Sequence, residues 1–235
     1  LEQVIDLRQR LRTVDGDHLG GHHLGNRRRS RIGHNPQRRL NSAMSRTLST
    51  MIPLGTALPE FEAAAPDGSR WDTASAAGAP GLLVVFRCNP CPFVVHRGRE
   101  LGRLTQRWAS RGLAVVGLNP NDAEAYPADA REKMAPFARS FGWDFPYLVD
   151  EGAEVATAFR AACTPDFFLF DGERTLVYRG RFDASRPGND SPVTGGELRA
   201  AVNALFDGVP GPTEQLPSMG CNIKWPPGRE PEWFG

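Results

Sequence analysis

The amino-acid sequence predicts an α/β domain of three layers, in which helices flank a mixed central sheet and an extended C-terminal tail follows. From Pro80 onward, short apolar runs rich in β-branched residues alternate with amphipathic segments, a pattern typical of buried parallel strands joined by helices. A turn at Asp171-Gly172 then separates two apolar runs, which indicates a hairpin. Part of the sheet is therefore expected to be antiparallel.

The order of elements follows from these patterns. Leu82–Phe86 and Leu113–Leu118 are short and apolar throughout, as expected of strands covered on both faces. Between them Val94, Leu101, Leu104 and Trp108 recur at helical spacing. We therefore expect strands at 82–86, 113–118, 147–149, 167–170 and 175–178, and helices at 94–108, 128–141, 154–161 and 197–206.

The composition limits the class of protein. The 235 residues are 40% hydrophobic and carry a net charge of +1, as in an ordinary globular protein. No run approaches the ~18 consecutive apolar residues of a membrane helix, and the beginning of the chain does not resemble a secretory signal. We expect a cytoplasmic protein that does not contact a membrane.

The first fifty residues differ from the rest. Residues 1–50 hold ten Arg, no Lys and four acidic residues, and all aromatic residues lie at or beyond Phe61. Such a segment buries too little apolar area to offset its chain entropy, so we expect a disordered basic leader, with a later translation start as one alternative. Two functional alternatives are a nucleic-acid-binding arm and a metal site. They would use Arg27, Arg28, Arg29 and Arg31, or His18, His22 and His23, respectively.

The remaining chain divides into a domain and a tail. Residues 51–235 hold 18 basic and 23 acidic residues, which does not favour a nucleic-acid partner for the folded part. We expect a domain over 51–208 and a Pro-rich tail over 209–235. Trp225 and Trp233 would anchor this tail on the domain.

Two of the four cysteines stand at a chemically meaningful spacing. Cys88-Asn89-Pro90-Cys91 follows the first buried strand and opens the first helix. Free N–H groups at a helix N-terminus stabilise a thiolate, and Arg87 adds a positive charge beside the first sulfur. A thiolate can attack a disulfide, and a second thiol three residues on can resolve the product. A zinc site, a structural disulfide and a pair of inert buried thiols remain as alternatives.

A second candidate motif, Cys163-Thr164-Pro165, comes directly before the 167–170 strand. Pro is permitted at the start of a strand, and a cis Thr164-Pro165 bond would leave the preceding backbone free to pair with an extended peptide. A trans proline that merely begins the strand is the alternative. Cys163 is either a third redox thiol or a small buried residue.

Four motifs occur in order along the chain: FRCNPCPFV, ACTPDFFLFD, YRGRFD and PSMGCNIKW. From about Leu54 to Trp225 the chain resembles the alkyl hydroperoxide reductase/thiol-specific antioxidant family, in its peroxiredoxin-like branch with a thioredoxin-type CxxC. The resemblance implies a thioredoxin-like fold, a redox centre at Cys88 and Cys91, and a cis-proline loop at Thr164-Pro165. We expect no cofactor and no metal.

The resemblance also implies an activity. We expect a thiol–disulfide oxidoreductase with Cys88 as the exposed attacking thiolate and Cys91 as the resolving thiol. Its substrates would be protein disulfides or low-molecular-weight thiols, with a thiol reductant. A thiol-dependent peroxidase acting on hydroperoxides is an alternative, although neither cysteine has the Thr three residues earlier that peroxiredoxins use. A redox-sensing or binding module without turnover is a further alternative.

Overall fold

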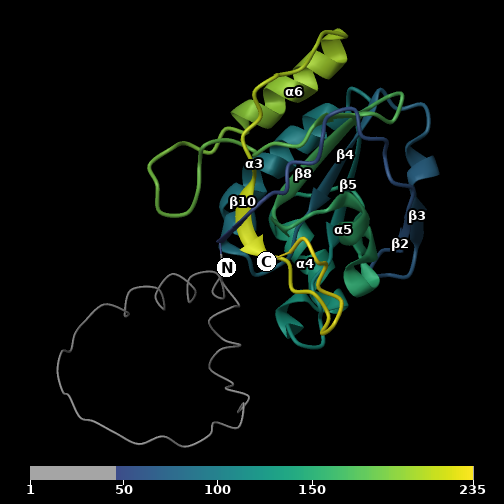
Figure 1. Ribbon diagram of the computed structural model, residues 1–235, viewed down its shortest axis with the longest axis vertical. Coiled ribbons are helices and arrows are strands. Elements are labelled where there is room, and N and C mark those ends of the chain that lie inside the picture. Colours follow the sequence, from purple (N-terminus) through teal and green to yellow (C-terminus); the bar gives the residue numbers. More distant parts are fainter. Residues whose placement is uncertain (1–45, 235) are drawn as a thin grey trace, which may run out of the picture. The chain divides into compact units, whose positions relative to one another are not determined.

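The computed structural model describes residues 46–234 (Figure 1). The strands are β1 (Arg46–Leu48), β2 (Glu62–Ala64), β3 (Arg70–Asp72), β4 (Gly81–Phe86), β5 (Ala114–Asn119), β6 (Tyr147–Val149), β7 (Cys163–Thr164), β8 (Asp166–Asp171), β9 (Leu176–Tyr178) and β10 (Met219–Asn222). The α-helices are α3 (Pro92–Ala109), α4 (Arg131–Ser140), α5 (Glu154–Phe159) and α6 (Gly196–Asp207). Short 3-10 turns cover Thr73–Ala76, Pro127–Asp129 and Glu151–Ala153.

The central sheet has seven strands in the order β3-β2-β6-β5-β4-β8-β9. Strands β4, β5 and β6 run parallel, whereas β8 pairs antiparallel with β4, β9 with β8, and β2 with β6. Val84 of β4 stands opposite Val116 of β5 on one side and Phe168 of β8 on the other. The expected mixed sheet is confirmed.

The two faces of the sheet carry separate apolar clusters. Side chains alternate along a strand, so Leu83 and Val85 of β4 pack with residues of α3 and α6, while Val84 and Phe86 pack on the opposite face with α5. Figure 1 shows α3 and α6 on one side of the sheet and α5 on the other. The three expected layers are therefore present.

A second, smaller sheet has the strand order β1-β10-β7. Cys221 of β10 pairs with Thr164 on one side and with Arg46 on the other. One expectation needs correction here, because residues 46–48 form a strand although they were assigned to a disordered leader. The tail, which was expected to be extended, contributes strand β10. Both strands are short and pair with distant residues, so they carry no local periodic signal.

The other predicted elements agree closely with the structure. The strands expected at 82–86, 113–118, 147–149, 167–170 and 175–178 are present, with ends shifted by no more than one residue. The helix expected at 128–141 begins as a 3-10 turn and becomes α-helical only at Arg131. Strands β2 and β3 were not predicted. The arginines and histidines that suggested a nucleic-acid or metal site in the leader lie outside the described residues.

The end of the tail packs on the sheet. Trp225 is 7% exposed and belongs to the same apolar cluster as Phe86 and Ile223, with Trp233 and Phe234 packed against it. The two tryptophan rings meet edge to face at 5.9 Å. Within residues 46–234, no helix combines the length and apolar character needed to cross a membrane.

Candidate redox site

The paired cysteines lie where β4 gives way to α3. Strand β4 ends at Phe86, and Cys91 is the N-cap residue of α3, with extended backbone angles (φ −66°, ψ 122°). Pro92 follows at the first helical position, where its missing N–H has no helical partner to lose. The expected strand-to-helix position of this motif is confirmed.

Both sulfur-bearing residues are buried, and this corrects the expectation of an exposed Cys88. Cys88 is 2% exposed and Cys91 is 3% exposed, whereas Pro90 between them faces solvent. They belong to an apolar cluster that also contains Cys221 from the tail. The other buried members of this cluster are Phe93, Val94, Met134, Ala138, Trp143 and Tyr147. Sequence alone did not reveal this cover, because it comes from α4, β6 and β10.

Three of the four cysteines converge on Thr164. The Cys91 Sγ atom lies 2.9 Å from Sγ of Cys221 and 3.1 Å from the carbonyl oxygen of Thr164. The Cys88 Sγ atom lies 3.1 Å from Oγ1 of the same threonine. All four cysteines are free thiols in this structure. The contact between Cys91 and Cys221 joins residues 130 positions apart.

The surroundings favour ionisation of one cysteine over its neighbours. Burial opposes the charged form of Cys91, yet hydrogen bonds from Cys221, Cys88 and the Val94 N–H outweigh it and hold the pKa of Cys91 well below its usual value. Burial and the nearby Cys91 sulfur raise the pKa of Cys88. The contact with Cys91, followed by burial, raises the pKa of Cys221. The surroundings therefore favour the thiolate form at Cys91 over that at Cys88 or Cys221.

Arg87 lies close enough to Cys88 for the two charges to interact, and its side chain packs among aromatic rings. The side chain is fully buried, and none of its guanidinium nitrogens has a hydrogen-bond partner among residues 46–234. The guanidinium carbon lies 3.0 Å from the ring centre of Trp143 and 4.2 Å from that of Tyr147, which is a cation–π contact. Burial lowers the pKa of Arg87 to about 9. Arg87 thus packs in an aromatic cage.

The Thr164-Pro165 peptide bond is cis, as expected, and both residues are buried. Cys163 precedes them on β7 and is 0% exposed. Its Sγ atom contacts two backbone oxygens, at 3.8 Å from Pro165 and 3.9 Å from Ser218. Strand alternation thus directs Cys163 away from the contacts that Thr164 makes with Cys88 and Cys91.

Sequence reasoning missed Asp129, which holds the loop between the two cysteines. Its Oδ1 atom accepts a hydrogen bond of 2.7 Å from the backbone N–H of Asn89, and Oδ2 accepts one of 2.9 Å from the Asn121 amide. Tyr147 donates to the Asn89 side chain at 3.1 Å. Burial raises the pKa of Asp129 in spite of these donors. The sequence offered a signal that residues after β5 lie near the cysteines. Asn119 ends β5 beside the end of β4, and the carboxyl ends of parallel strands meet at one edge of the sheet.

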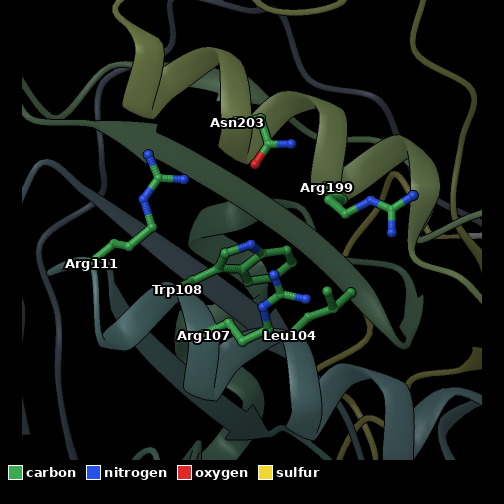
Figure 2. Close-up of a pocket in the computed structure, with 6 residues that line it drawn as sticks. All are labelled: Leu104, Arg107, Trp108, Arg111, Arg199 and Asn203. Carbon is green, nitrogen blue, oxygen red and sulfur yellow. The ribbon is translucent and has the colours of Figure 1, made fainter.

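A cavity of about 200 Å³ lies elsewhere, between α3 and α6 (Figure 2). Its lining residues are Leu104, Arg107, Trp108, Arg111, Arg199 and Asn203. None of these residues belongs to the cysteine cluster. The chemistry described above is therefore separate from this cavity.

Two of the solved structures that resemble this chain cover more than three quarters of it. A hypothetical protein from Sinorhizobium meliloti 1021 is 47% identical, with a TM-score of 0.76 over 77% of this chain and 100% of that one. An uncharacterized conserved protein from Geobacillus kaustophilus is 46% identical, with a TM-score of 0.77 over 79% of this chain and 98% of that one.

More distant structures share the fold. A putative protein disulfide isomerase from Bacteroides thetaiotaomicron is 20% identical, with a TM-score of 0.52 over 68% of this chain and 94% of that one. The fold is thioredoxin-like, as the sequence resemblance implied. The search of curated proteins gave no match. The AhpC/TSA family matches residues 54–179, more than half of the chain, and the chain therefore belongs to this family.

Proposed function

We propose that the chain is a thiol–disulfide oxidoreductase in which Cys91 and Cys88 alternate between the dithiol and the disulfide. The observation that carries this proposal is the position of Cys91 at the N-terminus of α3, among donors that favour its thiolate. We assign the attack to Cys91 and the resolving step to Cys88, the reverse of the order expected from the sequence. The raised pKa of Cys88 supports this order.

The proposed reaction is two successive thiol–disulfide exchanges. The Cys91 thiolate attacks one sulfur of a disulfide substrate, forms a mixed disulfide and releases the other half as a thiolate. Cys88 then loses its proton and attacks the Cys91 sulfur, which forms the Cys88–Cys91 disulfide and releases the second thiolate. Asp129 lies close enough to both sulfurs to affect their ionisation. It keeps the intervening loop in place through Asn89.

The substrates that suit this chemistry are protein disulfides and disulfides of low-molecular-weight thiols. A thiol reductant returns the centre to the dithiol. We assign this activity to the cytoplasm, where reduced thiols are abundant.

A second candidate activity is the reduction of hydroperoxides. It is favoured by the lowered pKa of Cys91 and by membership of the AhpC/TSA family. The Cys91 thiolate would attack the terminal oxygen of the hydroperoxide, and an alcohol or water would leave once it gained a proton. A neighbouring thiol would then condense with the sulfenic acid and release water. The hydroxyl of Thr164 contacts Cys88 rather than Cys91, so a hydroxyl partner of the usual kind is not in place.

The two activities are separated by half-reactions on the reduced protein. We expect oxidised glutathione to oxidise the wild type and Cys163→Ser at equal rates, and Cys91→Ser at least about a hundredfold more slowly. Cys88→Ser should first form the mixed disulfide with glutathione, detectable by mass at early times. Full reactivity of Cys91→Ser would refute the assignment. Oxidation by hydrogen peroxide no faster than that of free cysteine would exclude the peroxidase.

A further inference from the structure

The backbone edge beside the redox site is already occupied by the chain's own tail. In the sequence, the residues before Pro165 were expected to be free to pair with an incoming extended peptide. In the structure they pair with β10, with Cys221 opposite Thr164 and Asn222 opposite Cys163. Figure 1 shows β10, in yellow, beside α3. The tail thus binds as an added strand, which is also how many peptides bind to a sheet edge.

The contact between β10 and this edge is closer than a side chain would allow. A Cβ atom added at Gly220 would stand 2.5 Å from the carbonyl carbon of Thr164 and closer still to its oxygen. The strand is held beyond this point as well, because the Ile223 N–H donates to the Ala162 carbonyl at 3.1 Å. Gly220 is therefore required by close approach of two backbones.

This strand carries a thiol to the reactive sulfur. Cys221 is 9% exposed, and its Sγ atom lies 2.9 Å from Sγ of Cys91. Lys224 adds a positive charge on the same segment: its Nζ atom donates to the Asn222 carbonyl at 2.8 Å, and its attraction favours ionisation of Cys221. An extended segment that pairs beside Pro165 and presents a cysteine to Cys91 has the features expected of a bound protein substrate.

We propose that β10 is an internal substrate of the redox centre and that Cys221 exchanges with Cys91, so that oxidation produces a Cys91–Cys221 disulfide. This inference rests on the proposed function, since it requires Cys91 to be the attacking thiolate. After Cys91 has formed a mixed disulfide, the Cys221 thiolate attacks the Cys91 sulfur and the substrate thiolate leaves.

The Cys91–Cys221 disulfide passes its oxidation to the paired cysteines. The Cys88 thiolate attacks the Cys91 sulfur, the Cys88–Cys91 disulfide forms, and Cys221 leaves as a thiolate. No external oxidant is consumed in this second step. Because β10 covers the edge that a protein substrate would use, small disulfides react with the closed form, whereas a protein disulfide must displace β10.

The test maps the disulfides of the full chain after oxidation. Reduced protein is treated with oxidised glutathione and, separately, with hydrogen peroxide, its free thiols are then blocked, and it is cut with trypsin. The cysteines fall on three peptides, because cleavage after Lys and Arg gives 88–97 with two cysteines, 161–174 with Cys163, and 200–224 with Cys221. Cys88→Ser stops the onward exchange, so it should accumulate a link between the peptides 88–97 and 200–224. The same link should be absent from Cys221→Ser.

A second pair of variants tests the strand without removing a cysteine. Gly220→Ala places a methyl group against Thr164, whereas Gly211→Ala, in the same tail, adds a methyl group whose nearest neighbour is 3.9 Å away. In the Cys88→Ser background we expect Gly220→Ala to slow formation of the Cys91–Cys221 link by about tenfold or more, the size of a typical overpacking cost, and Gly211→Ala to leave it unchanged.

The outcomes separate the two proposals. If Cys88→Ser carries oxidised Cys91 only as a glutathione adduct or a sulfinic acid, never linked to Cys221, the internal-substrate inference is wrong and the proposed function stands. If neither oxidant modifies Cys91, the proposed function is wrong and the inference falls with it. Equal linking rates in Gly220→Ala and Gly211→Ala would refute the role of β10, since the pairing would then not position Cys221.

Discussion

Replacing Asp166 with Asn should remove a pH-dependent loss of stability. Asp166 begins β8, is 0% exposed, and has one carboxyl oxygen without a hydrogen-bond partner in the part of the chain that the structure describes. Burial raises the pKa of this carboxyl group from 3.8 to about 7, although the Ala162 N–H donates to its other oxygen. The charged carboxylate is therefore poorly accommodated in the folded chain.

The sign and size of the effect follow from the two pKa values. Between about pH 4 and pH 7 the folded chain keeps this proton and the unfolded chain does not, so the free energy of unfolding falls as the pH rises through that range. The full shift corresponds to about 4 kcal/mol. About 2.5 kcal/mol of it lies between pH 5 and pH 8.

The measurement is urea unfolding of the wild type and Asp166→Asn at pH 5 and pH 8. We expect the stability of the variant relative to the wild type to be about 2.5 kcal/mol more favourable at pH 8 than at pH 5. Only this difference matters, because the amide changes the local hydrogen bonds at both pH values. The exposed Asp144→Asn serves as the control. Parallel pH profiles for the wild type and Asp166→Asn would refute the reasoning.

Two further predictions concern packing. Phe159 is fully buried and meets four aromatic rings edge to face, so Phe159→Ala should lower the free energy of urea unfolding by about 3–5 kcal/mol. The control Leu216→Ala, at a half-exposed position, should change it by less than about 0.5 kcal/mol. A loss below about 1 kcal/mol in Phe159→Ala would contradict this packing. Arg87→Met should leave stability at pH 7 unchanged or raise it by up to about 2 kcal/mol, because it removes a buried cation without hydrogen bonds. The lowered pKa of Arg87, about 9, means that the wild type gains stability as the pH rises above 9, since the unfolded chain then binds more protons, and the variant should lack this gain in alkaline unfolding curves. A loss above about 2 kcal/mol in Arg87→Met at pH 7 would show that the aromatic cage depends on the cation.

The central sheet was accessible to sequence reasoning because its strands bury both faces. A run such as Leu82–Phe86 is apolar throughout, so it is recognisable as a buried strand. The 3-residue and 4-residue spacings up to Trp108 identify a helix, in which Leu101, Leu104 and Trp108 are buried. The position of Cys88 and Cys91 followed directly, since a motif between a buried strand and a helix has only one place to lie.

The parts that could not be predicted all depend on pairs that are far apart in the chain. Strand β10 contains Gly220 and Cys221 within four residues, too few to show alternation, and its partners are β1 and β7. The burial of Cys88 likewise comes from segments that follow it by dozens of residues. Asp129 looks like an ordinary loop residue until β4 and β5 are placed side by side.

The position of β10 between β1 and β7 determines which strand edges become exposed if β10 leaves. If β10 leaves to admit a protein disulfide, β1 and β7 each lose a hydrogen-bonded neighbour. Two unpaired strand edges are then exposed to solvent. Such edges recruit strands from other chains, and the nearest replacement in a concentrated solution is β10 of a second copy. Such an opened form would be prone to domain swapping, because β10 of a second copy would fit between β1 and β7 in the same way.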